Sequence, residues 1–385
     1  MVFVLKEPTA TSKGILMFTH KERPYIRPSV PHVAQRLEKL KKTYLFGMHF
    51  GWTVKNEPTT PFIDFYLGGK GVLEKAPDNP IPHIPLGSRN FTPKCFAPNP
   101  KQPKNWDILS ISTLGKFKNI PQLFQALRHV YDQRPQTRTL LIFSSPDTIN
   151  PATHYTTINE DFANLFSAKE RENITFIHQR QTHSLSPLSS KDIARFMQQS
   201  RLFTLFTDTE GGPKVLTESL CTGIPVVVKK HLGGAGRDYL DESNSKSFTT
   251  PPEAAECFFD IIENGLGFDP TPIAKEVRED YTVPKLEQEL KDLFNQKGEP
   301  WEGEIVKDTL NKRLPAHLVT LPRDLCTPLS DDLKSPSAVL EYTHIYLGME
   351  KPTALQKLTA DAHALPGKAL YRCKVIYRRF FPRKG

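Results

Sequence analysis

Apolar residues along the middle of the chain gather into short continuous runs, and segments of helical periodicity lie between them. The runs predict strands at 106–113, 139–144, 174–178, 202–207 and 224–228. Apolar residues at helical spacing predict helices at 120–131, 192–200, 213–221, 252–264 and 283–295. Strands that alternate with helices predict a parallel, doubly wound α/β sheet, and continuous apolar runs are typical of strands that are covered on both faces.

The pattern divides the chain into three parts. Residues 104–296 form the expected doubly wound domain. Upstream, residues 1–103 predict a short Rossmann-like domain with poorly marked helices and with strands at 14–19, 44–50 and 62–67. Periodicity fades in residues 297–385, a C-terminal extension with a candidate helix at 337–347 and a basic tail.

Composition and charge restrict the class of protein. The 385 residues carry a net charge of +9, which suits anionic partners in general. The chain has no recognisable nucleic-acid-binding module, so we expect no nucleic-acid partner. Five scattered cysteines without a CxxC pair predict neither a disulfide framework nor a zinc site. Because no apolar run reaches the roughly 18 residues that span a bilayer and the N-terminus lacks a signal-peptide pattern, we expect a cytoplasmic protein.

The last residues of the chain are strongly basic. Between Lys368 and Lys384 there are seven lysines and arginines and no acidic residue. Apolar and aromatic residues interleave with them, which is compatible with an interfacial helix on anionic lipid at the inner face of the plasma membrane. The pattern is equally typical of a solvated helix that packs one face on the protein, and the sequence leaves both interpretations open.

Residues 208–230, DTEGGPKVLTESLCTGIPVVVKK, combine the features of a ligand site at the end of a parallel strand. Ligands of open α/β sheets bind outside the carboxyl ends of the strands, where Glu210 is expected. The glycine pair that follows allows the backbone to approach a ligand closely. Pro213 suits the first turn of a helix, whose free N–H groups favour an anion such as a diphosphate. Lys214 adds a full positive charge at the same place.

A second glutamate, Glu218, lies further along the same predicted helix. Its carboxylate is able to accept two hydrogen bonds from vicinal hydroxyls, as on a ribose. Glu210 and Glu218 are separated by seven residues, and the segment GIPVV follows them. In this order the features resemble the retaining glycosyltransferases of family 4 (group 1), which have the GT-B fold of two Rossmann-like domains facing a cleft.

Two other segments carry the same resemblance. IPLGSRNF at 84–91 resembles the end of the first domain in that family, and ILSISTLGKFKNIPQLFQAL at 108–127 resembles the strand, loop and helix that open the second domain. The family's phosphate-binding lysine corresponds to Lys118. The arginine five residues before it is Thr113 here, which removes a bidentate phosphate clamp. Lys116 is near enough to substitute in part, as a point charge.

The resemblance implies a role for each matching residue. Glu210 would contact hydroxyls of the donor sugar and Lys118 the diphosphate. His20 follows a predicted first-domain strand, where a loop histidine is able to polarise a sugar hydroxyl or the acceptor, although a structural role stays open. These three are the expected catalytic residues, and the expected donor-binding residues are Gly211, Gly212, Pro213, Lys214, Val215, Glu218, Thr113, Lys116 and Gly234.

The implied reaction is the transfer of a sugar from a nucleotide diphospho-sugar to a hydroxyl acceptor, with retention of configuration. The basic surface favours a glycan or lipid-linked acceptor in cell-surface polysaccharide or glycolipid assembly. We expect no metal or other cofactor, because lysines and a helix N-terminus would stabilise the departing diphosphate.

Three other interpretations stay open. The two glutamates could be solvated charges near a helix start, where the helix dipole favours acidic residues. The chain could also be a catalytically degenerate GT-B protein that acts as a binding or scaffold subunit, an interpretation favoured by the missing arginine and the short first domain. A nucleotide-sugar epimerase of GT-B architecture would need no acceptor.

Overall fold

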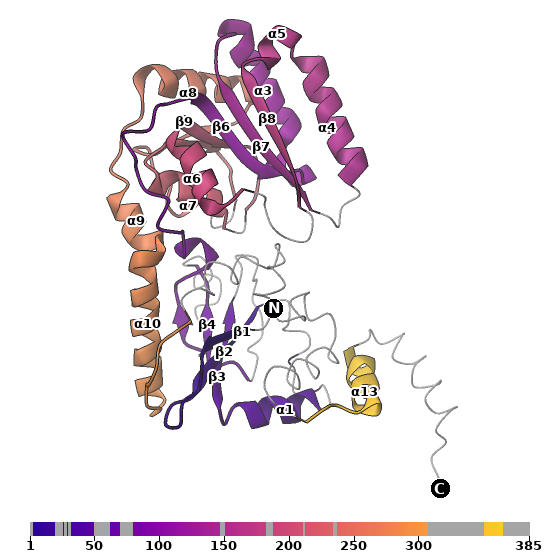
Figure 1. The fold of residues 1–385 in the computed structure, drawn as a ribbon, viewed down its shortest axis with the longest axis vertical. Coiled ribbons are helices and arrows are strands. Elements are labelled where there is room, and N and C mark those ends of the chain that lie inside the picture. The colour runs from indigo at the N-terminus through magenta and orange to yellow at the C-terminus, as the bar shows by residue number, and fades with distance from the viewer. Residues whose placement is uncertain are drawn as a thin grey trace, which may run out of the picture.

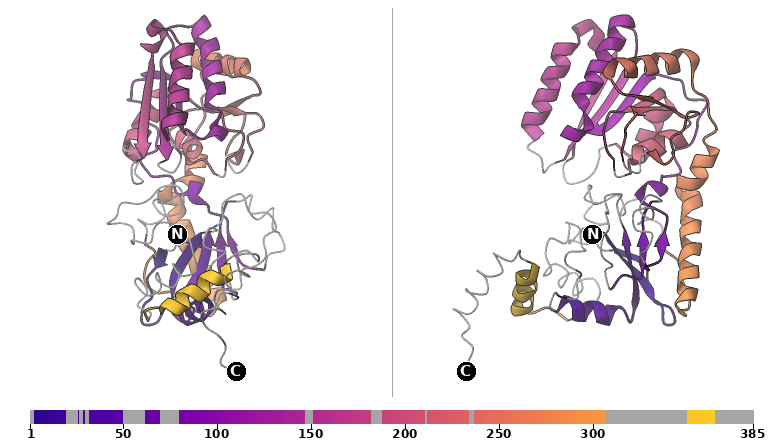
Figure 2. Two further views of the ribbon diagram at one scale, coloured as in Figure 1. Left: turned by 90° about the vertical axis from the view of Figure 1, so that its right-hand side faces the viewer. Right: turned by 180° about the vertical axis from the view of Figure 1, so that it is seen from behind.

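The computed structural model describes residues 3–19, 26, 29, 32–49, 62–69, 80–146, 151–181, 188–210, 212–233, 237–306 and 350–364. These residues form two α/β domains stacked along the longest axis of the molecule, each built on its own sheet (Figure 1, Figure 2). The candidate helix at 337–347 and the basic tail lie outside the described residues.

The second domain is built on a six-stranded sheet in which every described pairing is parallel. The strands run in the order β11-β10-β9-β6-β7-β8. Their bounds are β6 (Trp106–Thr113), β7 (Thr139–Pro146), β8 (Ile174–Gln181), β9 (Ser200–Leu205), β10 (Val226–Lys229) and β11 (Ser245–Phe248). The order reverses between β6 and β9, and ligands of such sheets bind at this switch point, outside the carboxyl ends of the strands.

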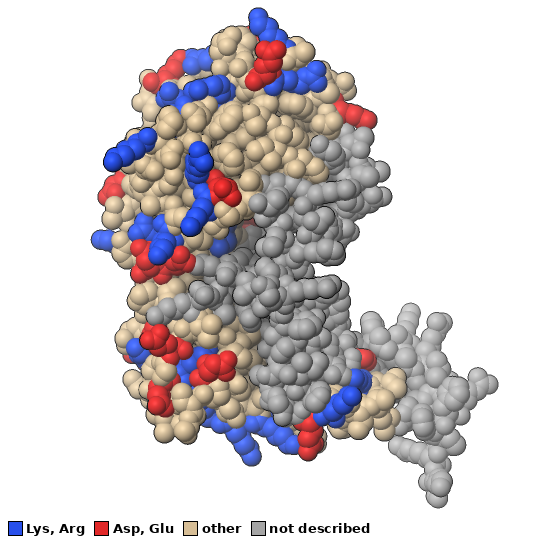
Figure 3. All heavy atoms as spheres, in the orientation of Figure 1, with Lys and Arg blue, Asp and Glu red and all other residues tan. Residues whose placement is uncertain are grey.

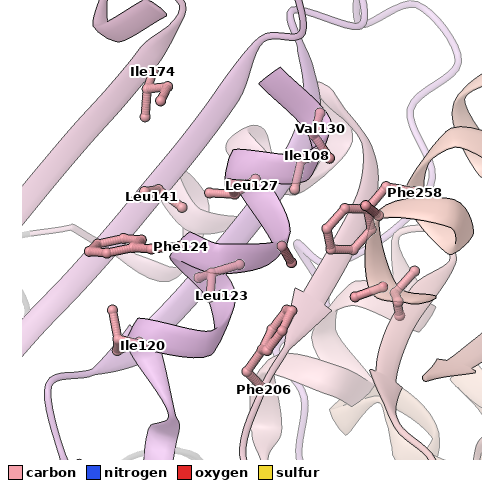
Figure 4. Close-up of a cluster of buried hydrophobic side chains, with 14 of the residues drawn as sticks. Ile108, Ile120, Leu123, Phe124, Leu127, Val130, Leu141, Ile174, Phe206 and Phe258 are labelled. Carbon is pink, nitrogen blue, oxygen red and sulfur yellow. The ribbon is translucent and has the colours of Figure 1, made fainter. Parts of the chain in front are cut away.

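Helices cover both faces of this sheet, as the continuous apolar runs predict. On one face, buried side chains of α3, α4 and α8 pack on Ile108 of β6 and Leu141 of β7 (Figure 4). On the other face, α6, α7 and α9 pack on Leu109 and Leu140, the next residue of β6 and the preceding residue of β7. The bounds are α3 (Ile120–Gln133), α4 (Pro151–Leu165), α6 (Ser190–Gln198), α7 (Lys214–Cys221), α8 (Pro251–Asn264) and α9 (Thr271–Val277), and α5 (Ala168–Arg171) is a short helix before β8.

The first domain contains a five-stranded sheet in the order β1-β2-β3-β4-β5. Its strands are β1 (Phe3–Lys6), β2 (Gly14–Thr19), β3 (Tyr44–His49), β4 (Phe65–Leu67) and β5 (His83–Ile84). The pairings from β2 to β5 are parallel, and β1 is an antiparallel edge strand. Alternate residues of β2 face opposite ways: Leu16 and Phe18 join α1 (Val33–Leu40) in one core, and Ile15 and Met17 join a second core on the other face.

The second of these cores is completed by a helix from far along the chain. Helix α10 (Glu279–Gln296) contributes five buried apolar side chains to it, namely Val283, Leu286, Leu290, Leu293 and Phe294. Figure 1 shows α10 running along the first domain, below α9. The hydrophobic periodicity assigns this helix to residues 104–296, whereas its apolar face packs on the first sheet. The division of the chain at residues 103 and 296 stays a prediction.

The chain passes between the domains at two places that lie side by side. The first follows the turn η2 (Ser88–Asn90), and the second lies between α9 and α10. The backbone N–H of Thr92 donates to the carbonyl of Val277 at 2.8 Å, and the N–H of Glu279 donates to the carbonyl of Thr92 at 2.9 Å. The two passages are therefore joined by a short parallel bridge.

Several local expectations differ from the structure. Helix α6 begins two residues before the expected start at 192 and is capped by Ser189. The Ser189 hydroxyl accepts from the backbone N–H of Asp192, and the backbone N–H of Ser189 donates to the Asp192 carboxylate, which is a capping box. The sequence pattern predicts no helix at α1, α4 or the last described helix, α13 (Ala354–Ala364). Periodicity is weak in α4 and α13, whereas α1 buries Val33, Leu37 and Leu40 on one face. Ala360 of α13 is buried in the core of the first domain that contains α1.

We expect Leu290→Ala to lower the free energy of unfolding by about 2–5 kcal/mol, because it leaves a cavity under the first sheet. Leu290 is fully buried in that core. The matched control is Leu358→Ala on α13, where the side chain is 69% exposed and the change should stay within about 0.5 kcal/mol. Urea denaturation followed by circular dichroism measures both. Equal, small effects would show that α10 does not support the first sheet.

Candidate functional site

The loops that follow β6 and β9 meet at the switch point of the second sheet. The loop after β6 contains the short turn η3 (Lys116–Lys118), which is closed by Asn119 in the left-handed conformation (φ 52°). The side-chain amide of Asn119 donates to the carbonyl of Phe206 at 3.0 Å and to the carboxylate of Asp208 at 2.8 Å. These bonds hold the two loops together, as a site at the carboxyl ends of adjacent strands requires.

Lys118 and Glu210, two of the expected catalytic residues, form an ion pair across these loops. Their side chains are only 12% and 13% exposed. Burial lowers the pKa of Lys118 to about 8, and the adjacent carboxylate opposes that shift because it stabilises the ammonium. The structure thus brings together an acid and a base that lie 92 positions apart in the sequence.

The loop after β10 fixes the backbone of Glu210. The N–H of Glu210 donates to the carbonyl of Gly233 at 3.0 Å, and the N–H of Gly233 donates to the carbonyl of Asp208 at 2.7 Å. A Cβ at Gly233 would approach the hydroxyl of Thr209 to 3.2 Å, so a glycine suits this position. Lys229, at the end of β10, pairs with Asp208 at 2.6 Å and holds the pKa of that carboxyl below its usual value.

A glycine turn leads from this loop into α7. Gly212 has φ +150°, a conformation that favours glycine. Pro213 is the N-cap of α7, so the helix starts one residue later than the sequence predicts, and no side chain caps it. The first backbone N–H groups of a helix have no intrahelical partner and carry the positive end of its dipole. The start of α7 at the switch point is therefore suited to an anion.

Lys214 and Glu218 lie one turn apart on α7. Burial lowers the pKa of Lys214 and raises the pKa of Glu218, while each stabilises the charge of the other. Neither side chain forms a hydrogen bond or an ion pair with a described residue. Glu279, at the start of α10, also stabilises the charge of Lys214. Two half-buried, oppositely charged groups are thus available to a ligand at the start of α7.

The other expected site residues that the structure describes have a position in the fold but no side-chain hydrogen bond or ion pair with Lys118 or Glu210. Thr113 is the last residue of β6 and pairs with Ser144 of β7. Lys116 is exposed on η3, and Val215 is half-buried in the first turn of α7. His20, Gly211 and Gly234 lie outside the described residues. Arg89, in η2, is a residue to which the sequence assigned no role, and it lies beside Gly212.

A metal site and a membrane-spanning helix each have structural requirements that the described residues do not meet. Within the ranges that the structure describes, no group of three or more His, Cys, Asp and Glu side chains is arranged to hold a metal ion. The same ranges contain no helix that is long and apolar enough to cross a membrane.

Comparison with known proteins identifies the family to which the second domain is similar. Residues 92–263 match the family model of glycosyl transferases group 1. The resemblance drawn from the motifs is therefore confirmed, and residues 92–263, which include most of the second domain, are similar to group 1 glycosyltransferases. No curated protein matches the sequence of the chain.

Solved structures confirm the GT-B fold. The pneumococcal O-GlcNAc transferase GtfA, solved with UDP and GlcNAc, is 14% identical with a TM-score of 0.50, and the match covers 68% of this chain and 55% of GtfA. HepE from Anabaena, solved with UDP and glucose, has the same identity and TM-score, with 68% of this chain and 74% of HepE covered. TarM is 12% identical with a TM-score of 0.50, and the match covers 73% of this chain and 54% of TarM. The chain thus spans about half the length of GtfA and of TarM.

We expect Gly212→Ala to lower the free energy of unfolding by about 1–3 kcal/mol, because a Cβ strains the backbone at this φ. The control is Gly267→Ala, where a Cβ would meet nothing within 4 Å and no positive φ occurs. There the stability should be unchanged or should rise by up to about 1 kcal/mol. Thermal unfolding of both variants measures the difference. If the two variants are equally stable, the turn before α7 does not require a glycine.

Proposed function

We propose that the protein transfers a sugar from a nucleotide diphospho-sugar to a hydroxyl acceptor, with retention of configuration. The observation that carries this proposal is the convergence of Lys118, Glu210 and the start of α7 at the switch point of a domain similar to group 1 glycosyltransferases. A nucleotide-sugar needs positive charge for its diphosphate and hydrogen-bond acceptors for its hydroxyls. A lysine and a helix N-terminus provide the first, and two glutamates provide the second.

The diphosphate lies at the start of α7 in this proposal. Backbone N–H groups after Gly212 donate to the phosphate oxygens, and Lys214 and Lys118 add positive charge. Lys116 replaces part of the charge that an arginine at position 113 would supply. The bond between the anomeric carbon and the diphosphate oxygen breaks while the acceptor oxygen bonds to that carbon. The acceptor proton passes to the leaving diphosphate, so the step needs no protein nucleophile and no metal.

Donor binding exchanges partners within the site. Before the donor arrives, Lys118 is paired with Glu210. The diphosphate, which carries more charge than one carboxylate, attracts Lys118 and leaves Glu210 to accept hydrogen bonds from the sugar hydroxyls. Glu218, whose carboxylate forms no hydrogen bond with a described residue, accepts hydrogen bonds from the ribose.

The proposal also includes the class of acceptor and the cellular location of the reaction. We propose a glycan or lipid-linked acceptor in cell-surface polysaccharide or glycolipid assembly, on the cytoplasmic side. The net charge of +9 supports an anionic acceptor or surface. In one view of the described surface, acidic and basic side chains are interspersed (Figure 3). The basic tail at 368–384 is therefore the segment that we propose for contact with an anionic membrane.

A scaffold role is the second candidate function, and Thr113 favours it. Without the arginine, a bidentate contact to phosphate is lost. A scaffold would retain the fold without binding a nucleotide-sugar, so donor binding distinguishes the two functions.

We expect one nucleotide among UDP, GDP, ADP and CMP, with its sugar derivatives, to bind the wild type. Glu218→Ala should weaken that binding about 10- to 100-fold, because hydrogen bonds to a charged group contribute about 1.5–3 kcal/mol. Isothermal titration calorimetry measures both affinities. The control is Glu256→Ala, an exposed glutamate on α8, which should bind like the wild type. Absence of binding at millimolar concentration would favour the scaffold.

The affinity for the nucleoside diphosphate should fall as the pH rises through about 8, where Lys118 loses its proton. A neutral amine does not attract phosphate, so the loss should approach about tenfold per pH unit above that pKa. The lowered pKa of Lys214 adds to the trend. In Lys118→Arg the side chain keeps its charge, and the profile from pH 7 to 9 should be flatter. An identical slope in the variant would exclude Lys118 as its source.

A further inference from the structure

Arg89 reaches from the last turn of the first domain into the second domain. Its side chain is only 3% exposed and forms an ion pair with Asp238, in the loop that follows β10. Its guanidinium carbon also lies 5.3 Å from the ring centre of Tyr239. The adjacent residue, Asn90, donates from its amide to the hydroxyl of Tyr239 at 2.8 Å. The loop after β10 is therefore held to the first domain by a charge, a ring contact and a hydrogen bond.

The backbone of Arg89 is attached to α7. The hydroxyls of Thr92 and Thr217 lie 3.3 and 3.4 Å from the carbonyl oxygen of Arg89, and 3.1 Å from each other. Thr217 is the residue before Glu218 on α7. The base of the Arg89 side chain is thereby set against the helix that carries Lys214 and Glu218.

The Arg89 side chain passes two glycines, one in each domain. A Cβ at Gly212 would lie 3.9 Å from Cδ of Arg89, and a Cβ at Gly69, which follows β4, would lie 2.6 Å from Nη2. The side chain therefore fills the space between the end of a first-domain strand and the turn that opens α7.

We propose that Arg89 is a positioning residue for the sugar half of the donor site, an inference that rests on the proposed function. Arg89 holds Asp238 and Tyr239, and Gly233 of the same loop accepts a hydrogen bond from the backbone N–H of Glu210. Gly212, the second residue after Glu210, lies beside the Arg89 side chain, so Arg89 borders the backbone on both sides of the proposed sugar-binding carboxylate. Because the Arg89 side chain is 3% exposed and paired with Asp238, its role in this inference is to hold the loop.

The chemistry of the guanidinium suits this role. A planar guanidinium pairs with a carboxylate and stacks on an aromatic ring at the same time, and a lysine ammonium does not reproduce both contacts. Buried ion pairs contribute little to net stability, and their best-supported role is to specify one arrangement. Arg89 lies between the loop after β10 and the turn before α7, so specifying their arrangement is the role that suits its ion pair.

The test uses full-length protein and three variants. Arg89→Met and Asp238→Asn each remove the pair, and Arg134→Met is the matched control. Arg134 also pairs with a carboxylate, Glu263, and lies 4.5 Å from the ring centre of Phe259, but it joins α3 to α8. Wild type is first titrated with UDP-glucose, GDP-mannose and ADP-glucose. The tightest of these and its nucleoside monophosphate are then the two probes for every variant, in calorimetry well below the melting temperature.

We expect Arg89→Met and Asp238→Asn to weaken binding of the sugar nucleotide about tenfold or more, since small displacements of a positioning group have large effects. The monophosphate should bind nearly as in the wild type, because it lacks the sugar that Glu210 contacts. Arg134→Met should change neither affinity. A merely structural pair would lower the melting temperature of Arg89→Met while leaving the ratio of the two affinities unchanged, and that result would overturn the inference.

The outcomes separate this inference from the proposed function. If the wild type binds no sugar nucleotide, the proposed function fails, and the inference fails with it. If the wild type binds but the ratio is unchanged in both variants, only the inference is overturned. Should Arg89→Met not fold, Asp238→Asn decides by the same ratio, because Asp238 lies in an exposed loop and is replaced by a side chain of equal size.

Discussion

The two domains meet at a junction in which two backbone hydrogen bonds link Thr92 to the segment from Val277 to Glu279. These bonds join the places where the chain enters and leaves the second domain. Because these passages are joined, α10 begins at the first sheet and covers the face opposite α1. The first domain therefore obtains its second core from residues that follow the second domain, which explains how about one hundred N-terminal residues suffice for a two-faced sheet.

The same junction places first-domain residues against the donor-side helix. The turn that contains Arg89 precedes Thr92, and its carbonyl lies against Thr217 of α7. The proposed donor site is thus bounded by loops of the second sheet and by the last turn of the first domain. Within it, Lys118 is paired with Glu210 and Asp208 with Lys229. Paired charges are less costly to bury than single ones, so this pairing suits a site that keeps its shape before a ligand arrives.

Local sequence determined the elements and the chemical groups of the second domain. Continuous apolar runs and helical periodicity located β6, β7, β8 and β9, together with helices α3 and α6, to within a few residues, since each run is long enough to carry its own signal. The residues from Glu210 to Glu218 form a single segment, so their order and spacing were sufficient for the family resemblance, and the family match confirmed it. Short or polar elements such as β11, with the sequence SKSF, carried no such signal.

Only the tertiary structure decided which distant residues meet. The periodicity of α10 shows that it has an apolar face but not which sheet receives it, because Leu286 and Leu290 would fit either core by composition. The pairing of Lys118 with Glu210 and the contact of Arg89 with Asp238 join residues from different loops. Such contacts depend on strand order and on the return of the chain through Val277–Glu279. Sequence determined what each segment is able to do, and the order of the strands determined which segments act together, because parallel strands bring loops from distant positions to one edge of a sheet.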